Sequence, residues 1–397
     1  MKSLDNVVFV SAVRTPMGKF GGTLKNMKTY DLAAFPVREA LKRAKVGGDE
    51  IDDAIIGSCR QAGNHVNPAK TAAVRGGAGM GVPGVTINKA CPAGMKAVSM
   101  ATQLIQVDQA KVVLCGGMES MSTIPHLLKG HRWEGFRMGP VTIEDGWSDA
   151  HDPVADMSMG LTAENLVDKY ELTRDELDQF AAESHQKAER AQKEGWFDEQ
   201  ITAITVPGTR KQPEFAFEKD ESIRYNADLA AMAKLKPAFK KDGSVTAGNA
   251  CGMTDGAAFL VAMTRDEAAK RGVQPLFSVV DYTQTAVDGR FMGEGPGVAI
   301  PQVLQRAGMQ LADMDLIEVN EAFAAQVIAN ERMLQWDRSK LNIHGGAIAL
   351  GHPTGCSGAR ILVTLYYALK GLDKEMGIAS ICGGGGASMA MIIKRES

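Results

Sequence analysis

Three side chains suited to covalent acyl chemistry, Cys91, His352 and Cys382, lie far apart in this 397-residue chain. Pro92 follows Cys91, and proline is favoured at the first helical position, so we predict a helix over 92–106 with Cys91 at its N-terminal end. Unpaired amides and the helix dipole at that end would lower the pKa of the thiol. A cysteine nucleophile and a histidine base from a distant segment form the pair that acyl transfer through a thioester requires.

His352 and Cys382 both lie in glycine-rich segments that favour a turn facing a ligand. The turn Gly351-His352-Pro353 can hold the imidazole ring towards a pocket, where a base must face the thiol that it deprotonates. Cys382 follows a predicted strand over 377–381 and precedes four glycines, whose backbone can approach a ligand closely. A dinucleotide-binding loop would need a following helix, whereas a short apolar run over 387–394 follows here. On these residues alone, a structural histidine, a structural cysteine and a plain tight turn remain open alternatives.

Asn320 ends a predicted strand, where its amide could orient a water molecule or polarise a carbonyl, although asparagine is also common in turns. No metal site is expected, because the seven histidines are scattered and neither a Cys-x-x-Cys nor a His-x-x-x-His pattern occurs. The basic stretch formed by Arg224 and the lysines between 234 and 241 could be a solvated face or could attract phosphates.

Composition narrows the class of protein. A hydrophobic content of 45%, a charged content of 23% and a net charge of −3 offer neither a basic footprint for nucleic acid nor a polybasic membrane patch. Residues 1–13 do not resemble a signal peptide, and four glycines interrupt the long apolar stretch over 376–393, which argues against a membrane span. The six cysteines are spread without close pairs, which favours free thiols in a reducing compartment, with the cytosol as the default.

The two ends of the chain are weakly similar to each other. The apolar segment 53–58 corresponds to 315–320, and 112–117 corresponds to 379–384. In each half of the chain, a turn that opens a helix lies between these two apolar segments. The number of residues that separates each segment from its counterpart is nearly constant, which suggests a duplicated α/β unit. Chance similarity among glycine-rich turns is the alternative. Between these halves, residues 120–245 are irregular apart from a predicted helix that begins at the capping box Thr173–Glu176 and a short apolar helix near 227–235. We expect this inserted part to cover a pocket.

Taken together in order, the motifs of this chain resemble those of the thiolase family from end to end. The matching segments are Asn88-Lys-Ala-Cys91, Gly116-Gly-Met-Glu-Ser-Met-Ser122, Thr246-Ala-Gly-Asn249, Asp255-Gly-Ala-Ala258, Asn320-Glu-Ala-Phe-Ala324, Gly351-His-Pro353 and Cys382-Gly-Gly-Gly385. The resemblance implies an α/β thiolase fold, in which two duplicated βαβαβαββ halves form five α/β/α/β/α layers. The implied parts are residues 1–119 plus 246–270 for the first half, 120–245 for a loop domain covering the coenzyme A site, and 271–397 for the second half.

The resemblance also implies roles for the site residues. His352 would activate Cys91, which takes an acyl group from one acyl-CoA, and Cys382 would then remove a C2 proton from acetyl-CoA. Asn320, through a water molecule, and His352 would form one oxyanion site, and the amides of Cys91 and Gly384 would form the other. The coenzyme A and acyl positions implied in the same way are Arg224, Cys251, Met159, Met292 and Phe323.

Some positions depart from the family's pattern, and all of them border the expected acyl pocket. Pro92-Ala93 follows the nucleophile, Cys251 and Ser158 occupy places where relatives often have Ser and His, and Gly386-Ala387 follows the final glycines. The covering segment 149–156 is also longer. These departures make acyl chain length and branching the least determined property.

The expected function is therefore a CoA-dependent acyltransferase that reversibly joins two acetyl-CoA, or acyl-CoA and acetyl-CoA, into a 3-ketoacyl-CoA. Coenzyme A and acetyl-CoA are substrates, no tightly bound cofactor is expected, and the family commonly forms a homotetramer. Three alternatives stay open: a degradative thiolase for longer, branched or aromatic substrates, a decarboxylating ketoacyl synthase of similar fold, and an inactive CoA-binding subunit.

Overall fold

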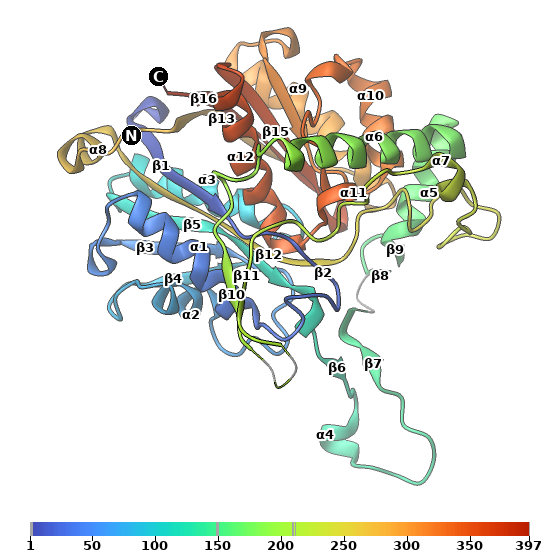
Figure 1. The fold of residues 1–397 in the computed structure, drawn as a ribbon. Helices are drawn as coiled ribbons and strands as arrows, with labels where there is room; N and C mark the ends of the chain where they lie inside the picture. Colours follow the sequence, from blue (N-terminus) through green and yellow to red (C-terminus); the bar gives the residue numbers. More distant parts are fainter. Residues whose placement is uncertain (1–2, 148–150, 209, 211, 397) are drawn as a thin grey trace.

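The computed structural model describes residues 3–147, 151–208, 210 and 212–396, and its centre is a mixed β-sheet built from both halves of the chain (Figure 1). The strand order is β14-β15-β16-β13-β1-β12-β5-β3-β4, with β2 paired to β12. The first half supplies β1 (Val7–Arg14), β2 (Gly18–Lys19), β3 (Asp53–Gly57), β4 (Gly84–Ile87), β5 (Val112–Ser120) and β12 (Thr254–Thr264). The second half supplies β13 (Phe277–Ala286), β14 (Leu316–Val319), β15 (Met376–Cys382) and β16 (Ala387–Arg395).

The pairing directions repeat between the halves. β3 is parallel to β5, which is antiparallel to β12, which is antiparallel to β1. In the same way β14 is parallel to β15, which is antiparallel to β16, which is antiparallel to β13. The two sets meet where Val8 and Phe9 of β1 pair with Ser278 and Phe277 of β13. The predicted duplication is confirmed in these pairing patterns.

Helices form three layers around the two sets of strands. α1 (Thr29–Arg43) and α2 (Pro68–Arg75) cover the first set, and α9 (Gly295–Ala307) covers the second, with α10 (Ala324–Leu334) packed beside it. α3 (Ala93–Gln106) and α12 (Thr354–Gly371) pack against each other between the sets. This gives the five-layered α/β/α/β/α arrangement that the resemblance implied.

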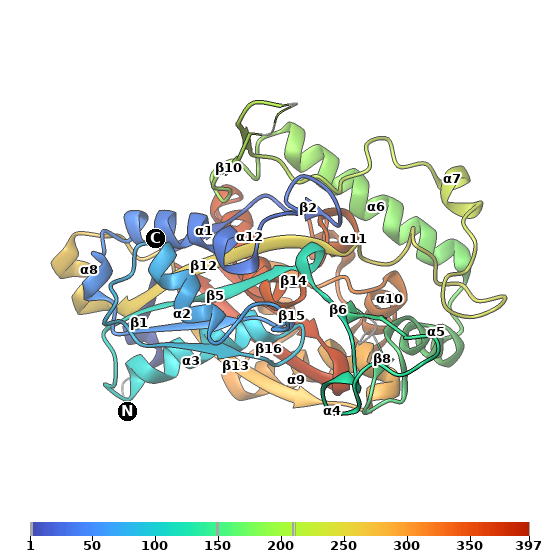
Figure 2. The same cartoon turned by 90° about the horizontal axis from the view of Figure 1, so that it is seen from below.

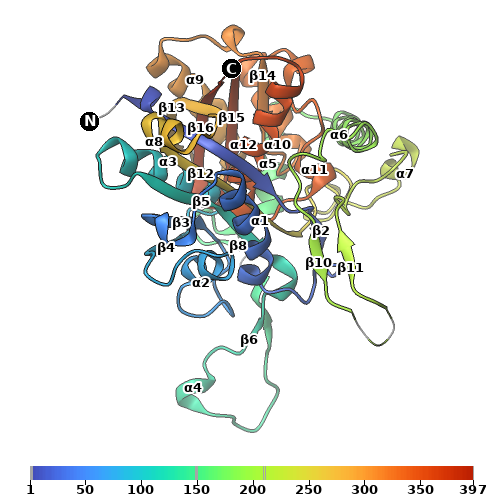
Figure 3. The ribbon, with the colours of Figure 1, turned by 60° about the vertical axis from the view of Figure 1, so that its left-hand side comes forward.

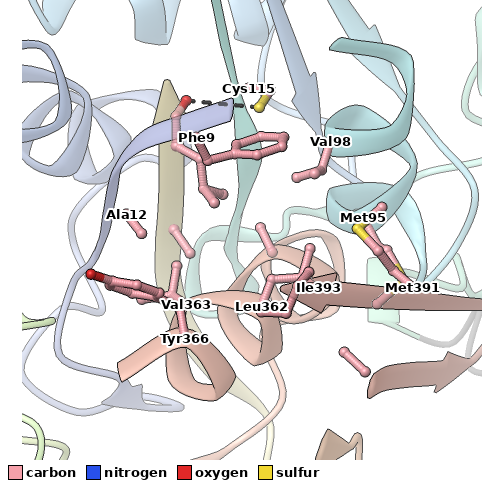
Figure 4. Packing of buried hydrophobic residues seen from close by; sticks show 14 of the residues in the cluster. Phe9, Ala12, Met95, Val98, Cys115, Leu362, Val363, Tyr366, Met391 and Ile393 are labelled. Atoms are coloured by element: carbon pink, nitrogen blue, oxygen red, sulfur yellow. Dashed lines mark hydrogen bonds between the residues drawn. The ribbon is translucent and has the colours of Figure 1, made fainter. Parts of the chain in front are cut away.

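The central helix α12 is enclosed because strands flank it on both faces. Every residue of α12 from Gly355 to Leu369 is buried, as expected for a helix enclosed by a core. Figure 4 shows Met95 and Val98 of α3 in the same packed cluster as Leu362 and Val363 of α12. The helices approach closely, since a Cβ atom on Gly358 would lie 2.5 Å from the amide nitrogen of Met95. Any larger residue at that position would push the helices apart.

The inserted part consists of an arm, a covering segment and a helical region. The arm, with β6 (His126–Leu127), α4 (His131–Glu134) and β7 (Glu144–Asp145), projects far from the body (Figures 1 and 3). The covering segment pairs β8 (His151–Asp152) with β9 (Met157–Ser158), and the predicted part at 149 and 150 lies outside the described residues. α5 (Met159–Tyr170) and α6 (Arg174–Lys193) follow, and α6 packs on α7 (Leu229–Ala233), α10 and α11 (Ala347–Leu350) (Figure 2). A two-stranded ribbon, β10 (Ile204–Val206) and β11 (Phe215–Phe217), and α8 (Arg265–Arg271) complete the elements.

The local start signals are confirmed. Thr173 caps α6 and forms the predicted capping box with Glu176, and the Thr264 side chain accepts from the amide of Glu267 at the start of α8. The helix predicted from Pro92 begins at Ala93, one residue later, with Pro92 as its N-cap. Within the described residues, no helix has both the length and the apolar character needed to cross a membrane.

Candidate active site

Cys91 lies in a tight turn between β4 and α3. The Asn88 side chain stabilises this turn, because its oxygen accepts from the amide of Ala90 at 3.0 Å. Ala90 has a positive φ of 51°, and this strained residue turns the chain towards Cys91, which is partly exposed. The Cys91 sulfur is therefore held at the N-terminal end of α3, as predicted.

The predicted lowering of the Cys91 pKa is wrong. Burial raises the pKa of the thiol to about 11, although the amide of Gly384 and the charge of Arg60 act in the opposite direction. Although the residue is partly exposed, the segments packed around its sulfur remove enough water that desolvation of the thiolate outweighs the stabilisation by nearby amides and by the cation. In the resting protein Cys91 is a thiol, so its use as a nucleophile needs a base.

His352 is held in a geometry suited to such a base. Its amide donates to the oxygen of Gly252 at 3.0 Å, and its Nδ1 lies 2.7 Å from the hydroxyl of Ser357. The Ser357 hydroxyl also lies 3.0 Å from the oxygen of Pro353, and when it donates its single proton there, Nδ1–H of the imidazole donates to Ser357. Nε2 then carries the lone pair, and this buried atom has no hydrogen-bond partner among the described residues.

The charge state of His352 also suits a base. Burial, assisted by the charge of Arg360, lowers the pKa of His352 to about 3. The ring is therefore neutral at physiological pH and able to accept a proton. Acceptance creates a buried cation, so the proton is held weakly and is available for return to a thiolate leaving group.

Asn320 lies at the end of β14 and is fully buried. Its amide oxygen faces Arg360, whose Nη2 lies 3.5 Å away, and Arg360 is held in turn by a buried ion pair with Glu318 at 3.2 Å. The Nδ2 group of Asn320 has no partner among the described residues. An unsatisfied buried donor is uncommon and calls for a ligand or water molecule.

The turn between β15 and β16 brings Cys382 to Cys91. Gly383 packs so closely that a Cβ atom there would lie 2.6 Å from Cδ of Pro92 and 3.2 Å from the amide nitrogen of Cys91. The next residue, Gly384, directs its amide to the Cys91 thiol. Cys382 itself is buried, and burial together with the neighbouring Cys91 raises the pKa of its thiol far above the usual value. The protonated thiols of Cys91 and Cys382 therefore lie next to each other beside the glycine turn.

Of the expected acyl-pocket residues, Met159 borders this turn. The sulfur of Met159 lies 3.7 Å from the position that a Cβ of Gly384 would occupy. Cys251 donates its amide to the oxygen of Ala322 at 3.1 Å, and the adjacent Ala250 pairs with Phe323. Met292 is buried in the same hydrophobic cluster as Phe323. Cys251 interacts electrostatically with both Cys91 and Cys382.

Arg224 lies apart from these residues, at the surface. Its amide donates to Nδ1 of His185 at 3.1 Å, and its guanidinium donates to the oxygen of Ala247 at 3.3 Å. The structure therefore places Arg224 near the Thr246–Asn249 segment that leads to Cys251. This position suits contact with a distal part of a long ligand.

Sequence reasoning missed several residues that organise the site. Glu119 is fully buried, and one of its oxygens accepts from the amide of Cys59 at 2.9 Å and from the amide of Gly355 at 3.0 Å. It thus joins the loop after β3 to the start of α12, which follows His352. Glu119 belongs to a segment that the motif comparison included without giving it a role. Ser357 carried only a weak signal, its position one turn into the helix after His352.

Among the described residues, no cluster of three or more His, Cys, Asp and Glu side chains could hold a metal ion.

The layered fold, the two thiols brought together by a glycine turn and a buried imidazole with an unpartnered nitrogen fit an α/β enzyme of thioester chemistry. The family models for the thiolase N-terminal and C-terminal domains match residues 7–266 and 273–395. The chain belongs to the thiolase family.

Relatives cover the whole length of the chain. An acetyl-CoA acetyltransferase of Cupriavidus necator is 45% identical over 398 residues, covering 99% of this chain and 100% of the relative. A probable acetyl-CoA acyltransferase of Staphylococcus epidermidis is 45% identical over 394 residues, covering 99% of each. Among solved structures, the Bacillus anthracis acetyl-CoA acetyltransferase has a TM-score of 0.96 at 46% identity, covering 100% of both chains. Human mitochondrial 3-ketoacyl-CoA thiolase in complex with CoA has a TM-score of 0.95 at 39% identity, also covering 100% of both chains.

Proposed function

We propose that this thiolase reversibly condenses two acetyl-CoA, or acyl-CoA and acetyl-CoA, into a 3-ketoacyl-CoA and free CoA through an acyl-enzyme on Cys91. The observation that carries the proposal is the contact of the β15–β16 turn with the Cys91 turn. This contact puts a nucleophilic thiol, a second thiol and an amide donor within one site.

The first half-reaction needs a base and an oxyanion site. Nε2 of His352 takes the proton of the Cys91 thiol, and the sulfur attacks the thioester carbonyl of acyl-CoA. The amides of Cys91 and Gly384 stabilise the developing negative charge, and one such donor contributes roughly 3–4 kcal/mol to catalysis. The CoA thiolate leaves as the Cys91 thioester forms, and the leaving thiolate takes a proton from the thiol of Cys382. The raised pKa of Cys382 supports this order, since that residue is a thiol until CoA leaves.

The second half-reaction uses the Cys382 thiolate. It removes a C2 proton from acetyl-CoA, and the resulting enolate is stabilised by the free Nδ2–H of Asn320, acting through a water molecule, and by the protonated imidazole of His352. The carbanion attacks the Cys91 thioester, and the Cys91 thiolate leaves and regains its proton from His352. All proton transfers balance, and the reverse sequence cleaves a 3-ketoacyl-CoA.

The proposed reaction also assigns roles to the substrate-binding residues. Coenzyme A and its acyl esters are the ligands, Arg224 contacts the phosphate-bearing end, and Cys251 lies beside the pantetheine. Met159, Met292 and Phe323 line the acyl pocket, and the T-shaped contact between Phe239 and Phe323, at 6.2 Å between ring centroids, adds an aromatic wall. No tightly bound cofactor takes part.

A degradative role towards longer, branched or aromatic acyl groups is the second candidate. Thioether side chains adapt their shape to irregular apolar groups, and Met159 borders the oxyanion turn directly. Assay of thiolysis over straight, branched and aromatic 3-ketoacyl-CoAs separates the two candidates by their relative kcat/KM.

The assembly and location belong to the same proposal. We assign the chain to a homotetramer, because the arm exposes apolar side chains that a monomer would leave in water, with Trp133 91% and Phe136 74% exposed. The parts of the molecule are 1–119 plus 246–270, the covering domain 120–245, and 271–397. Six free cysteines are consistent with the reducing cytosol.

The test is trapping of the acyl-enzyme. Incubation with acetyl-CoA, acid quenching and peptide mass spectrometry should locate acetylation on Cys91. Cys91→Ser should abolish this label, and Cys382→Ala should keep it while losing carbon–carbon bond formation. A wild-type protein that binds CoA without acylation would instead favour the inactive CoA-binding subunit, and normal condensation by Cys382→Ala would refute the division of roles.

A further inference from the structure

The glycine turn that carries the oxyanion amide is held from three directions. At its start, Gly383 packs on Pro92 and Cys91. At its end, a Cβ atom on Gly386 would lie 2.0 Å from the oxygen of Val287, and the Val287 amide donates to the Gly386 oxygen at 3.0 Å. The middle, where Gly384 directs its amide to Cys91, has neither of these supports.

The third support comes from the covering segment. Asp152 in β8 is only 5% exposed, and its Oδ2 accepts a hydrogen bond from the amide of Gly385. The same oxygen is 3.9 Å from the position that a Cβ of Gly384 would occupy. Its Oδ1 accepts from the amide of Val154 at 2.8 Å, which fixes the carboxylate. Among the described residues, backbone amides are the partners of this buried carboxylate, and no cation is paired with it.

We propose that Asp152 is a positioning residue for the oxyanion site formed by the amides of Gly384 and Cys91, an inference that rests on the proposed function. A run of four glycines has more backbone freedom than any other sequence, so the direction of one amide within it is poorly determined by the chain itself. A charge-assisted bond to the next amide along, at Gly385, removes that freedom. The covering segment thereby acts on catalysis without touching the reacting atoms.

The alternative is that Asp152 only stabilises the covering segment. That role predicts a loss of stability and of substrate affinity, with the chemical step unchanged in molecules that remain folded. The positioning role predicts a loss in the acylation step and a change in the thiol of Cys91. Arg60, Glu119, Cys59, Cys251 and Cys382 also interact electrostatically with Cys91, and His352 is its proposed base; a substitution at Asp152 changes none of these residues.

The experiment compares Asp152→Ala, Asp152→Asn and the control Asp156→Asn. Asp156 lies in the same segment, is exposed, and pairs at 3.1 Å with the exposed His151. The measurements are the single-turnover rate of Cys91 acetylation by acetyl-CoA, the KM for acetyl-CoA, and the pH dependence of Cys91 alkylation by iodoacetamide.

Asp152→Ala should acetylate about 10- to 100-fold more slowly, the range expected when one oxyanion donor is displaced rather than removed. Its KM should change less than about twofold, and alkylation of Cys91 should shift to higher pH because the Gly384 amide favours the thiolate. Asp152→Asn keeps an acceptor oxygen and should recover most of the rate, and Asp156→Asn should equal the wild type.

Wild-type acetylation by Asp152→Ala would overturn the proposal, and so would equal losses in both Asp152 variants with an unshifted alkylation profile. If Asp152→Ala does not fold, Asp152→Asn still tests the proposal. Its neutral acceptor should cause a smaller but measurable loss of the acetylation rate, together with the shift of Cys91 alkylation to higher pH. If Asp152→Asn shows neither change, the positioning role is refuted. A wild-type protein that does not acetylate would refute the proposed function instead.

Discussion

Replacement of Ser357 by alanine tests whether the tautomer of His352 is set by one hydroxyl group. Nδ1 of the imidazole lies 2.7 Å from the Ser357 oxygen, and the hydroxyl proton is directed to Pro353. In Ser357→Ala the Nδ1–H group loses its partner in a site that is only 5% exposed. An unsatisfied buried donor costs about 1–3 kcal/mol, so the tautomer with a free Nε2 lone pair becomes less favourable by that amount.

The expected effect follows by converting this energy into a population. At 1.36 kcal/mol per tenfold, about 1–3 kcal/mol corresponds to a 5- to 150-fold change in the ratio of the two tautomers, which is the upper limit for the loss of the competent form. The rate of Cys91 acetylation in a single turnover should fall by up to that factor, whereas the KM for acetyl-CoA should stay nearly constant. Rapid-quench mass spectrometry of the Cys91 peptide measures the rate directly.

The matched control is Thr364→Val on the same helix. Its hydroxyl donates to Gln200 at 3.3 Å, far along α12 from His352, so its loss perturbs the helix without reaching the base. The reasoning would be refuted if Ser357→Ala acetylated at the wild-type rate, or if both variants lost activity equally.

Other predictions concern the nucleophile, the core and the arm. The pKa of Cys91 is raised to about 11, so the thiolate fraction is small at neutral pH. Alkylation of Cys91 by iodoacetamide in the absence of substrate should therefore accelerate almost tenfold per pH unit up to about pH 11. A plateau of the alkylation rate near pH 8 would contradict this prediction. Gly358→Ala should lower the free energy of unfolding by about 1–3 kcal/mol, since its Cβ would lie 2.5 Å from the Met95 nitrogen. Gly81→Ala, which meets no atom within 4 Å, should be nearly neutral in the same denaturant titration. Substituting Trp133 and Phe136 by glutamate should reduce the mass measured by light scattering from that of a tetramer without changing the circular dichroism spectrum, and an unchanged mass would remove the arm from the interface.

Local signals were sufficient for much of the secondary structure. The capping box at Thr173 predicted where α6 begins, because a cap satisfies amides within one turn of itself. The alternation of apolar runs and glycines predicted β15, the following turn and β16 to within a residue or two. The repeated pattern of the two ends also predicted the duplicated pairing, since each copy of the pattern forms the same strands.

Interactions across the fold were not accessible in this way. The effect of the helix terminus on Cys91 was derived from neighbours in the chain, but the pKa of its thiol is governed by burial under segments far away in sequence. Glu119 attracted no role because its partners, Cys59 and Gly355, are 60 and 236 positions away. Asp152 and Gly385 are separated by 233 positions, so no local pattern connects them.

The amino-acid sequence by itself determined which chemistry is available: two thiols, one imidazole, one amide and a flexible glycine turn, each at the end of a predictable strand or helix. The tertiary structure alone decided how they act, because the packing of α3 against α12 and of the β15–β16 turn against Cys91 sets their separation, their burial and their proton affinities. Chemical identity is a property of single residues, whereas desolvation and hydrogen-bond direction arise only when distant segments exclude water together.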